Sequence, residues 1–203
     1  MSGRSFDETI RAAGRALVVG IGGGGDVVGS IAVARLCESL GTPASVGGVA
    51  WERLPIDPHP GPRSLAEIRG GRPAGRFAVI AGPETTTPQG VRFSESIVAE
   101  RLGTETALID VTGGAAGVAR GLGEAARELG CELVILADIG GDAIATGEES
   151  GLASPLCDAL MLAGAVELMA QAGIATLGAV LGAGCDGELE PDEVLARVAA
   201  IGR

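Results

Sequence analysis

The sequence predicts one α/β domain spanning residues 1–203, a three-layer sandwich in which helices cover both faces of a mostly parallel sheet of about six strands. Apolar runs of strand length alternate with segments of helix length, which is the order of elements in parallel α/β proteins. The runs are apolar at nearly every position, as expected for strands buried on both faces. With 46% hydrophobic residues, the chain can build one large core.

The expected elements follow one another along most of the chain. Strands are expected at residues 16–21, 44–51, 77–81, 107–111, 133–137 and 175–181, and helices at residues 27–40, 93–102, 115–129, 155–171 and 191–201. In the third helix, Val118, Leu122 and Leu129 follow the 3.6-residue period, so one face is predicted to lie on the sheet.

The helix expected at residues 155–171 is apolar on nearly every side. Ser154 is a typical N-cap, and Pro155 suits the first position of a helix. After the first turn its polar residues are Glu167 and Gln171, which lie on one stripe. Such a helix either forms an interface in a homo-oligomer or is covered by its own domain.

Residues 52–76 interrupt the alternation. This segment is rich in proline and carries His59, the single histidine of the chain. Long irregular loops in compact domains are usually functional or disordered, and proline limits the disorder. We interpret the segment as a lid or arm at a ligand site, where Arg53 and Arg63 would supply positive charge.

Composition excludes several classes of function. The 15 basic residues are all arginine, so the chain has no lysine, and it also has no tyrosine. This excludes a P-loop, a Schiff-base lysine and the Tyr–Lys pair of short-chain dehydrogenases. The net charge of −11 argues against nucleic acid. We find neither a membrane span nor a signal peptide, and the four cysteines lack zinc-site spacing. We therefore expect a cytoplasmic protein with reduced thiols.

The most informative motif is a run of glycines, Gly22, Gly23, Gly24 and Gly25, followed by Asp26 between the first strand and the first helix. Backbone amides in such a turn, together with the start of the helix, form a binding site for anions. The motif predicts phosphate binding. It also matches the G-x-G-x-x-G pattern of Rossmann-like dinucleotide sites, in which Glu52 would bind a ribose. A dinucleotide-dependent oxidoreductase is therefore an alternative.

Acidic and small residues follow the expected strands, and ligands of parallel sheets bind at that edge. We expect Asp26, Asp138, Asp142 and Asp186 to lie there and to hold a divalent metal ion. Carboxylate ligands favour Mg²⁺ as this ion. The metal would bridge the carboxylates to a phosphate that they would otherwise repel. The alternative roles are an N-cap for Asp26 and turn stabilisation for Asp138 and Asp142.

Further candidates come from the same edge. Arg53, Thr112 and Gly113 are expected to contact the cofactor or its phosphate, and Thr85 to Thr87 are expected either to bind a ligand or to cap the next segment. Catalytic roles are assigned to Asp138, Asp142, Glu52 and His59. A histidine can act as an acid or a base in catalysis, so His59 either contacts substrate or is an exposed loop histidine.

Several blocks together resemble a known family. They are residues 22–30, residues 51–53 with 55–58 and 60–63, and residues 138–142 followed by 149–156. The chain is similar in these blocks to the uncharacterised archaeal and bacterial family "domain of unknown function eleven fifty-two". The resemblance implies no activity, but it suggests that these blocks belong to one site.

The leading hypothesis is an intracellular enzyme that binds a phosphorylated or nucleotide-like small molecule with a divalent metal and catalyses group transfer or hydrolysis. A homo-oligomer is expected, with neither nucleic acid nor membrane as partner. The alternative outside catalysis is an oligomeric nucleotide-sensing or assembly protein.

Overall fold

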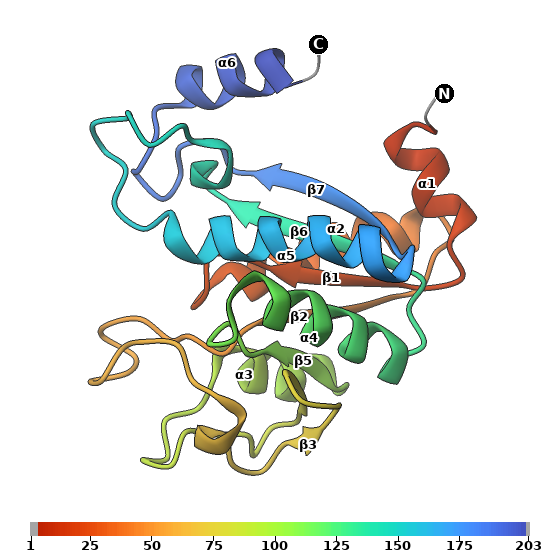
Figure 1. Ribbon diagram of the computed structural model, residues 1–203, viewed down its shortest axis with the longest axis vertical. Helices are drawn as coiled ribbons and strands as arrows, with labels where there is room; N and C mark the ends of the chain where they lie inside the picture. The colour runs from red at the N-terminus through yellow and green to blue at the C-terminus, as the bar shows by residue number, and fades with distance from the viewer. Residues whose placement is uncertain (1–3, 202–203) are drawn as a thin grey trace.

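A seven-stranded sheet forms the middle layer of the molecule, and the computed structural model describes residues 4–201 around it (Figure 1). The strand order is β3–β4–β5–β2–β1–β6–β7. The strands are β1 (Ala16–Gly20), β2 (Ala44–Val49), β3 (Arg72–Pro73), β4 (Ala78–Ala81), β5 (Thr106–Ile109), β6 (Leu133–Ile139) and β7 (Ala175–Leu181). Because β5, β2, β1, β6 and β7 run parallel, the predicted fold class is confirmed.

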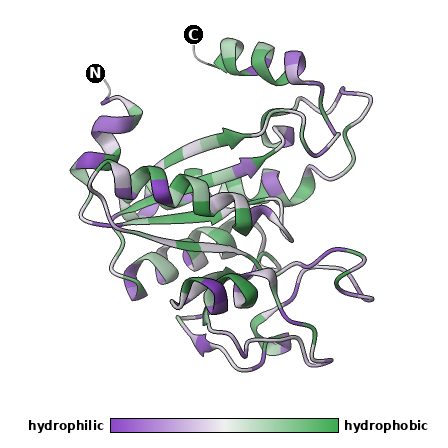
Figure 2. Ribbon diagram, turned by 180° about the vertical axis from the view of Figure 1, so that it is seen from behind, coloured by the Kyte–Doolittle hydropathy of each residue, from purple (hydrophilic) through white to green (hydrophobic). Residues whose placement is uncertain are grey.

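Helices lie on both faces of this sheet, as Figure 1 shows from one side and Figure 2 from the other. Helices α1 (Phe6–Ala12), α2 (Asp26–Ser39) and α3 (Ser94–Leu102) pack on one face, and α4 (Gly114–Glu128) and α5 (Leu156–Ala172) on the other. Helix α6 (Pro191–Ile201) lies beyond β7 and contacts the short 3₁₀ helix Asp142–Ile144. The sequence did not predict α1, a seven-residue helix that a Ser5–Glu8 capping box starts.

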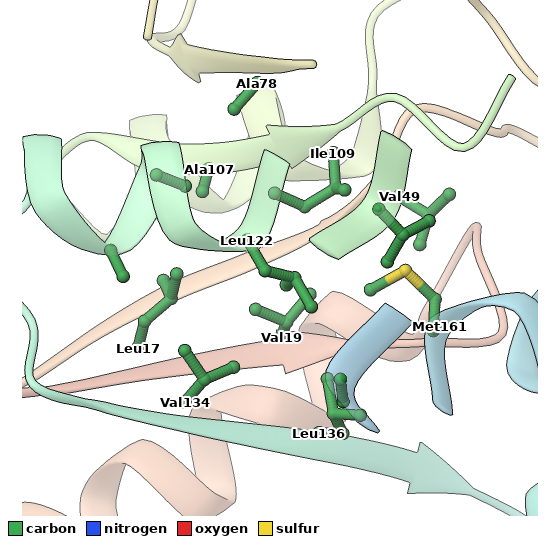
Figure 3. Packing of buried hydrophobic residues seen from close by; sticks show 14 of the residues in the cluster. Leu17, Val19, Val49, Ala78, Ala107, Ile109, Leu122, Val134, Leu136 and Met161 are labelled. Atoms are coloured by element: carbon green, nitrogen blue, oxygen red, sulfur yellow. The ribbon is translucent and has the colours of Figure 1, made fainter. Parts of the chain in front are cut away.

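The hydrophobic core has one large cluster on each side of β1 and a third, smaller cluster around Phe93 and Leu108. Leu17 and Val19 point towards α4 and α5, where they meet Leu122 and Met161 (Figure 3). The alternate residue Val18 belongs to the layer under α1 and α2. Burial of both faces explains why these strands are apolar throughout. Within residues 4–201, no helix is long and apolar enough to cross a membrane.

The sequence led us to expect residues 82–87 at the same edge as the other strand ends. This expectation was wrong, because β4 runs antiparallel to β5. Parallel neighbours need a crossover connection, whereas β4 follows β3 directly in an antiparallel pair. The threonines that follow β4 have local roles. The Thr85 hydroxyl accepts a hydrogen bond from Gly82 N at 3.0 Å, and the Thr87 hydroxyl accepts one from Val91 N at 3.2 Å.

The proline-rich segment is fastened to the sheet for most of its length. Arg63 N donates to Ala50 O at 2.7 Å, and Leu65 N donates to the Asp110 carboxylate at 3.0 Å. Further on, Arg69 pairs with Thr86, and β3 adds a strand to the edge of the sheet. The segment is thus a largely fixed extension of the β4 edge, with its first residues at the ends of β2 and β1.

Strand β1 and helix α2 approach each other closely at Gly20. A Cβ atom there would overlap the carbonyl carbon of Asp26 and lie 2.5 Å from Val27 N. Gly25, in the same run, has a φ of −73° and open space around its Cβ position. The two glycines therefore form a matched pair.

Gly20→Ala is expected to lower the free energy of unfolding by about 2 kcal/mol or more, since overpacking in a rigid core typically costs about 1–3 kcal/mol. Gly25→Ala is expected to change it by less than about 1 kcal/mol. Urea unfolding followed by circular dichroism measures both. Equal stabilities for the two variants would contradict the close approach at Gly20.

Candidate functional site

The candidate site lies where the order of the parallel strands reverses direction along the chain. From β1 the chain passes through α2 to β2 on one side, and from β6 it passes through α5 to β7 on the other. Ligands of open α/β sheets bind in the crevice at the carboxyl ends of two such strands. A hollow of about 190 Å³ lies there, lined by Gly22, Gly23, Asp26, Arg53, Ile139, Asp142, Ser154, Asp186 and Glu188.

Carboxylates in and below this hollow form two groups. The inner acidic cluster consists of Asp26, Asp138 and Asp158, and the outer acidic cluster consists of Asp142, Asp186 and Glu188. Within each cluster, one oxygen from every residue lies within 4.8 Å of the others. The four aspartates that the sequence assigned to a metal are therefore divided between two positions. Asp26 and Asp142 both line the hollow, so the clusters are neighbours.

The inner cluster is built by three different elements. Asp26 begins α2 and accepts a hydrogen bond from Gly22 N at 2.7 Å. Asp138 lies in β6 and accepts from Gly141 N at 3.4 Å and Ala143 N at 3.3 Å. Asp158 lies in the first turn of α5, is 1% exposed, and has no hydrogen-bond partner among the described residues.

Burial and mutual repulsion disturb the titration of these carboxyl groups. Burial, reinforced by Asp142 and Asp138, raises the pKa of Asp158 to about 8. Burial raises the pKa of Asp26 to about 6 against the opposing effect of the Gly22 amide. The pKa of Asp138 is raised by burial and by Asp142. A nearby cation would reverse each of these shifts, because it favours the charged carboxylate.

The outer cluster faces the solvent more openly. Asp142 is 7% exposed, and burial together with Glu188 and Asp186 raises its pKa. Glu188 accepts hydrogen bonds from Ala153 N at 2.7 Å and from the amide and hydroxyl of Ser154. These bonds fix the loop before α5 against the loop after β7.

Arg53 supplies positive charge to the hollow. Its guanidinium lies 4.8 Å from the centre of the Trp51 ring and donates a hydrogen bond to Gly22 O. Among the described residues that line the hollow, it is the one cation. Stacking and the hydrogen bond hold it beside the carboxylates without a direct ion pair to them.

The glycine run is only partly free to bind an anion. Gly22 N donates to Asp26, and Gly24 N donates to Trp51 O at 2.9 Å. Gly22 and Gly23 line the hollow, whereas Gly24 is buried and Gly25 faces solvent. Positive φ values of 80° and 58° at Gly23 and Gly24 explain why glycine is needed there.

Five other residues assigned from the sequence lie outside the lining of the hollow: Glu52, His59, Arg63, Thr112 and Gly113. Glu52 is buried, and its carboxylate accepts hydrogen bonds from the amide and hydroxyl of Ser94, so it caps α3. His59 is exposed in the proline-rich segment. Thr112 donates its hydroxyl to Asp110 at 2.6 Å beside Gly113, the N-cap of α4, and Arg63 pairs with Asp57 at 2.7 Å. These residues were predicted from their positions after strands and in the proline-rich loop. Such positions do not reveal the hydrogen bonds and ion pairs that polar side chains form with their neighbours.

Asp158, Glu188 and Ser154 were missed as site residues. Asp158 is a charged residue in an otherwise apolar helix, and this was the available signal, because charged side chains are seldom fully buried without a function or a partner. Three cysteines, Cys37, Cys131 and Cys157, are buried thiols as expected, whereas Cys185 is exposed.

The chain belongs to the family described as "Protein of unknown function (DUF1152)", whose profile matches residues 17–203. This match confirms the resemblance found in the sequence. No curated protein and no solved structure matches the chain.

Without metal, the charged form of Asp158 is expected to destabilise the fold. Its folded pKa of about 8 lies above the ordinary 3.8, so stability should fall as the pH rises from about 4 to 8. Asp158→Asn removes this effect. In chelator at pH 8 it should raise the free energy of unfolding by more than about 1 kcal/mol, since one pKa unit corresponds to about 1.4 kcal/mol.

Thermal unfolding between pH 5 and pH 8 measures this effect. The matched control is Asp192→Asn, an exposed aspartate in the first turn of α6, which should follow the wild-type curve. A lower melting temperature for Asp158→Asn at pH 8 in chelator would contradict the argument.

Proposed function

We propose that this protein is a cytoplasmic enzyme that binds a phosphorylated or nucleotide-like small molecule together with Mg²⁺ and catalyses group transfer or hydrolysis. The observation that carries the proposal is that the outer acidic cluster and Arg53 line the same hollow. Carboxylates alone repel a phosphate, but a cation held between them accepts its oxygens.

The residues of the hollow divide into complementary roles. Asp142, Asp186 and Glu188 are the cation ligands, with the nearly buried Asp142 as the one on which affinity depends most. Arg53 donates to phosphate oxygens, because a guanidinium matches their geometry. When bound, the cation neutralises negative charge that develops on the transferred group.

The size of the hollow supports a compact anionic group as its occupant. A volume of about 190 Å³ is below the range of about 300–1,000 Å³ for sites that enclose whole drug-sized ligands. We therefore assign the hollow to the phosphate-containing part of the ligand, with the remainder extending past its mouth.

A dinucleotide-dependent oxidoreductase is the second candidate, favoured by the strand order β5–β2–β1–β6–β7, which is that of dinucleotide-binding sheets. Against it, the Asp26 carboxylate already accepts a hydrogen bond from Gly22 N in the glycine turn where a pyrophosphate would bind, and Glu52 caps α3. Binding of NAD(P)H without Mg²⁺ would favour this candidate, and Mg²⁺-dependent ligand binding without turnover would favour a nucleotide sensor.

Calorimetric titration with pyrophosphate and with ATP tests the proposed function. Binding is expected only when Mg²⁺ is present. Arg53→Gln should weaken it by about 10- to 100-fold, because hydrogen bonds to charged groups contribute about 1.5–3 kcal/mol. In Asp142→Asn, adding Mg²⁺ should no longer produce binding of either ligand.

The control is Arg120→Gln, which removes an exposed arginine of α4 and should leave both affinities unchanged. If wild-type protein binds neither ligand in Mg²⁺, or if Asp142→Asn binds as wild type does, the proposal is wrong.

We further propose that the protein is a homo-oligomer that associates through α5. One side of this helix packs against α4, but Leu156 and Val166 are each 61% exposed and Met169 is 44% exposed. Within residues 4–201 nothing covers them. In Figure 2, α6 is also largely hydrophobic beyond its first turn. Apolar side chains exposed together on one helix are typical of association surfaces.

Val166→Glu is expected to shift the protein to a smaller assembly, because a charge would be buried at the contact. Light scattering after size-exclusion chromatography measures the mass. Val28→Glu is the matched control, since Val28 is 58% exposed on α2 at the opposite face of the sheet. An unchanged mass for Val166→Glu would exclude α5 as the interface.

A further inference from the structure

The inner acidic cluster contains an unusual feature, a buried carboxylate that the hydrogen-bond network does not use. Both oxygens of Asp158 lack a partner in the described part of the chain, and its residue is 1% exposed. Burying an unpaired charge is unfavourable, so proteins pair such groups, protonate them or bind them to metal. The side chain lies with those of Asp26 and Asp138 around one point.

The neighbours of Asp158 offer it negative charge and no cation. Asp138 and Asp26 each retain lone pairs beyond the backbone hydrogen bonds that they accept. No ion pair within residues 4–201 joins any of the three to an arginine. Three carboxylates therefore converge from α2, β6 and α5, with one oxygen of each within 4.8 Å of the others.

We propose that Asp26, Asp138 and Asp158 form a second divalent-cation site beneath the outer acidic cluster. An all-carboxylate ligand set suits the hard cations Mg²⁺ and Mn²⁺, and the absence of cysteine and histidine from it disfavours zinc. The inner site thus differs from the outer one in burial, while the ligand chemistry of the two is the same.

The two sites are adjacent, which indicates how the two cations would act together in catalysis. This catalytic role rests on the proposed function. Asp26 of the inner cluster and Asp142 of the outer cluster line the same hollow. Paired cations in phosphoryl-transfer enzymes stabilise the attacking and the leaving oxygen together. The substrate class is therefore a phosphate ester or anhydride that spans both cations.

Counting Mn²⁺ bound to the full chain by equilibrium dialysis and electron paramagnetic resonance tests the inner site. Wild type is expected to bind two ions per chain and to show the spectrum of a spin-coupled pair. Asp158→Asn should lose one ion and the coupling while keeping the outer ion. Glu188→Gln should lose the outer ion and the coupling while keeping the inner ion.

Asp192→Asn, an exposed variant, is the control and should bind two ions. Should Asp158→Asn fail to fold, Asp138→Asn replaces it with the same expected loss. One ion in wild type that a folded Asp158→Asn protein retains, or two ions in a folded Asp158→Asn protein, would overturn the inner site. In that case Asp158 is simply protonated.

The same experiment separates the two proposals. Two Mn²⁺ ions without pyrophosphate or ATP binding would leave the inner site standing and remove the proposed function. One ion that a folded Asp158→Asn protein retains, together with Mg²⁺-dependent binding of either ligand, would overturn the inner site and leave the proposed function standing.

Discussion

Negative charge held out of water between β1 and β6 is the constraint on which the site depends. The start of α2, the end of β6, the 3₁₀ helix after it and the first turn of α5 each place an aspartate in this crevice. These elements can pack there only if the charges are neutralised by protons or by cations. Arg53 lies at the mouth and does not reach an ion pair with any of them. The packing of these four elements and the proposed binding of cations therefore depend on the same carboxylates.

Much of the fold followed from periodicity alone. The runs that became β1 and residues 133–137 of β6 are apolar and buried throughout, and the period of α4 identified its core face, so local pattern and tertiary structure agree there. The direction of β4 could not be predicted in this way. It depends on β3, a two-residue strand that pairs through backbone groups and has no side-chain pattern.

The candidate site was predictable to the extent that it follows strand ends. Asp138 lies near the end of β6, and Asp26, Asp142 and Asp186 follow the ends of β1, β6 and β7 within a few residues. The structure brings all four to one crevice. Asp158 comes from a helix start, and its position depends on the angle at which α5 returns over the sheet. Glu52 also follows a strand, but its carboxylate is bound to Ser94, and only the tertiary structure shows that α3 begins beside it.

The stacking of Arg53 on Trp51 gives the molecule an intrinsic optical reporter. Trp51 is the only tryptophan, and the chain has no tyrosine, so absorption near 280 nm and the fluorescence that it excites arise almost entirely from this one indole. Its carbonyl accepts a hydrogen bond from Gly24 N in the glycine run, and its ring stacks on Arg53, which lines the hollow. Any event that moves that guanidinium changes the electric field across the ring. Occupancy of the crevice can thus be followed in unlabelled protein, from a single position in the chain.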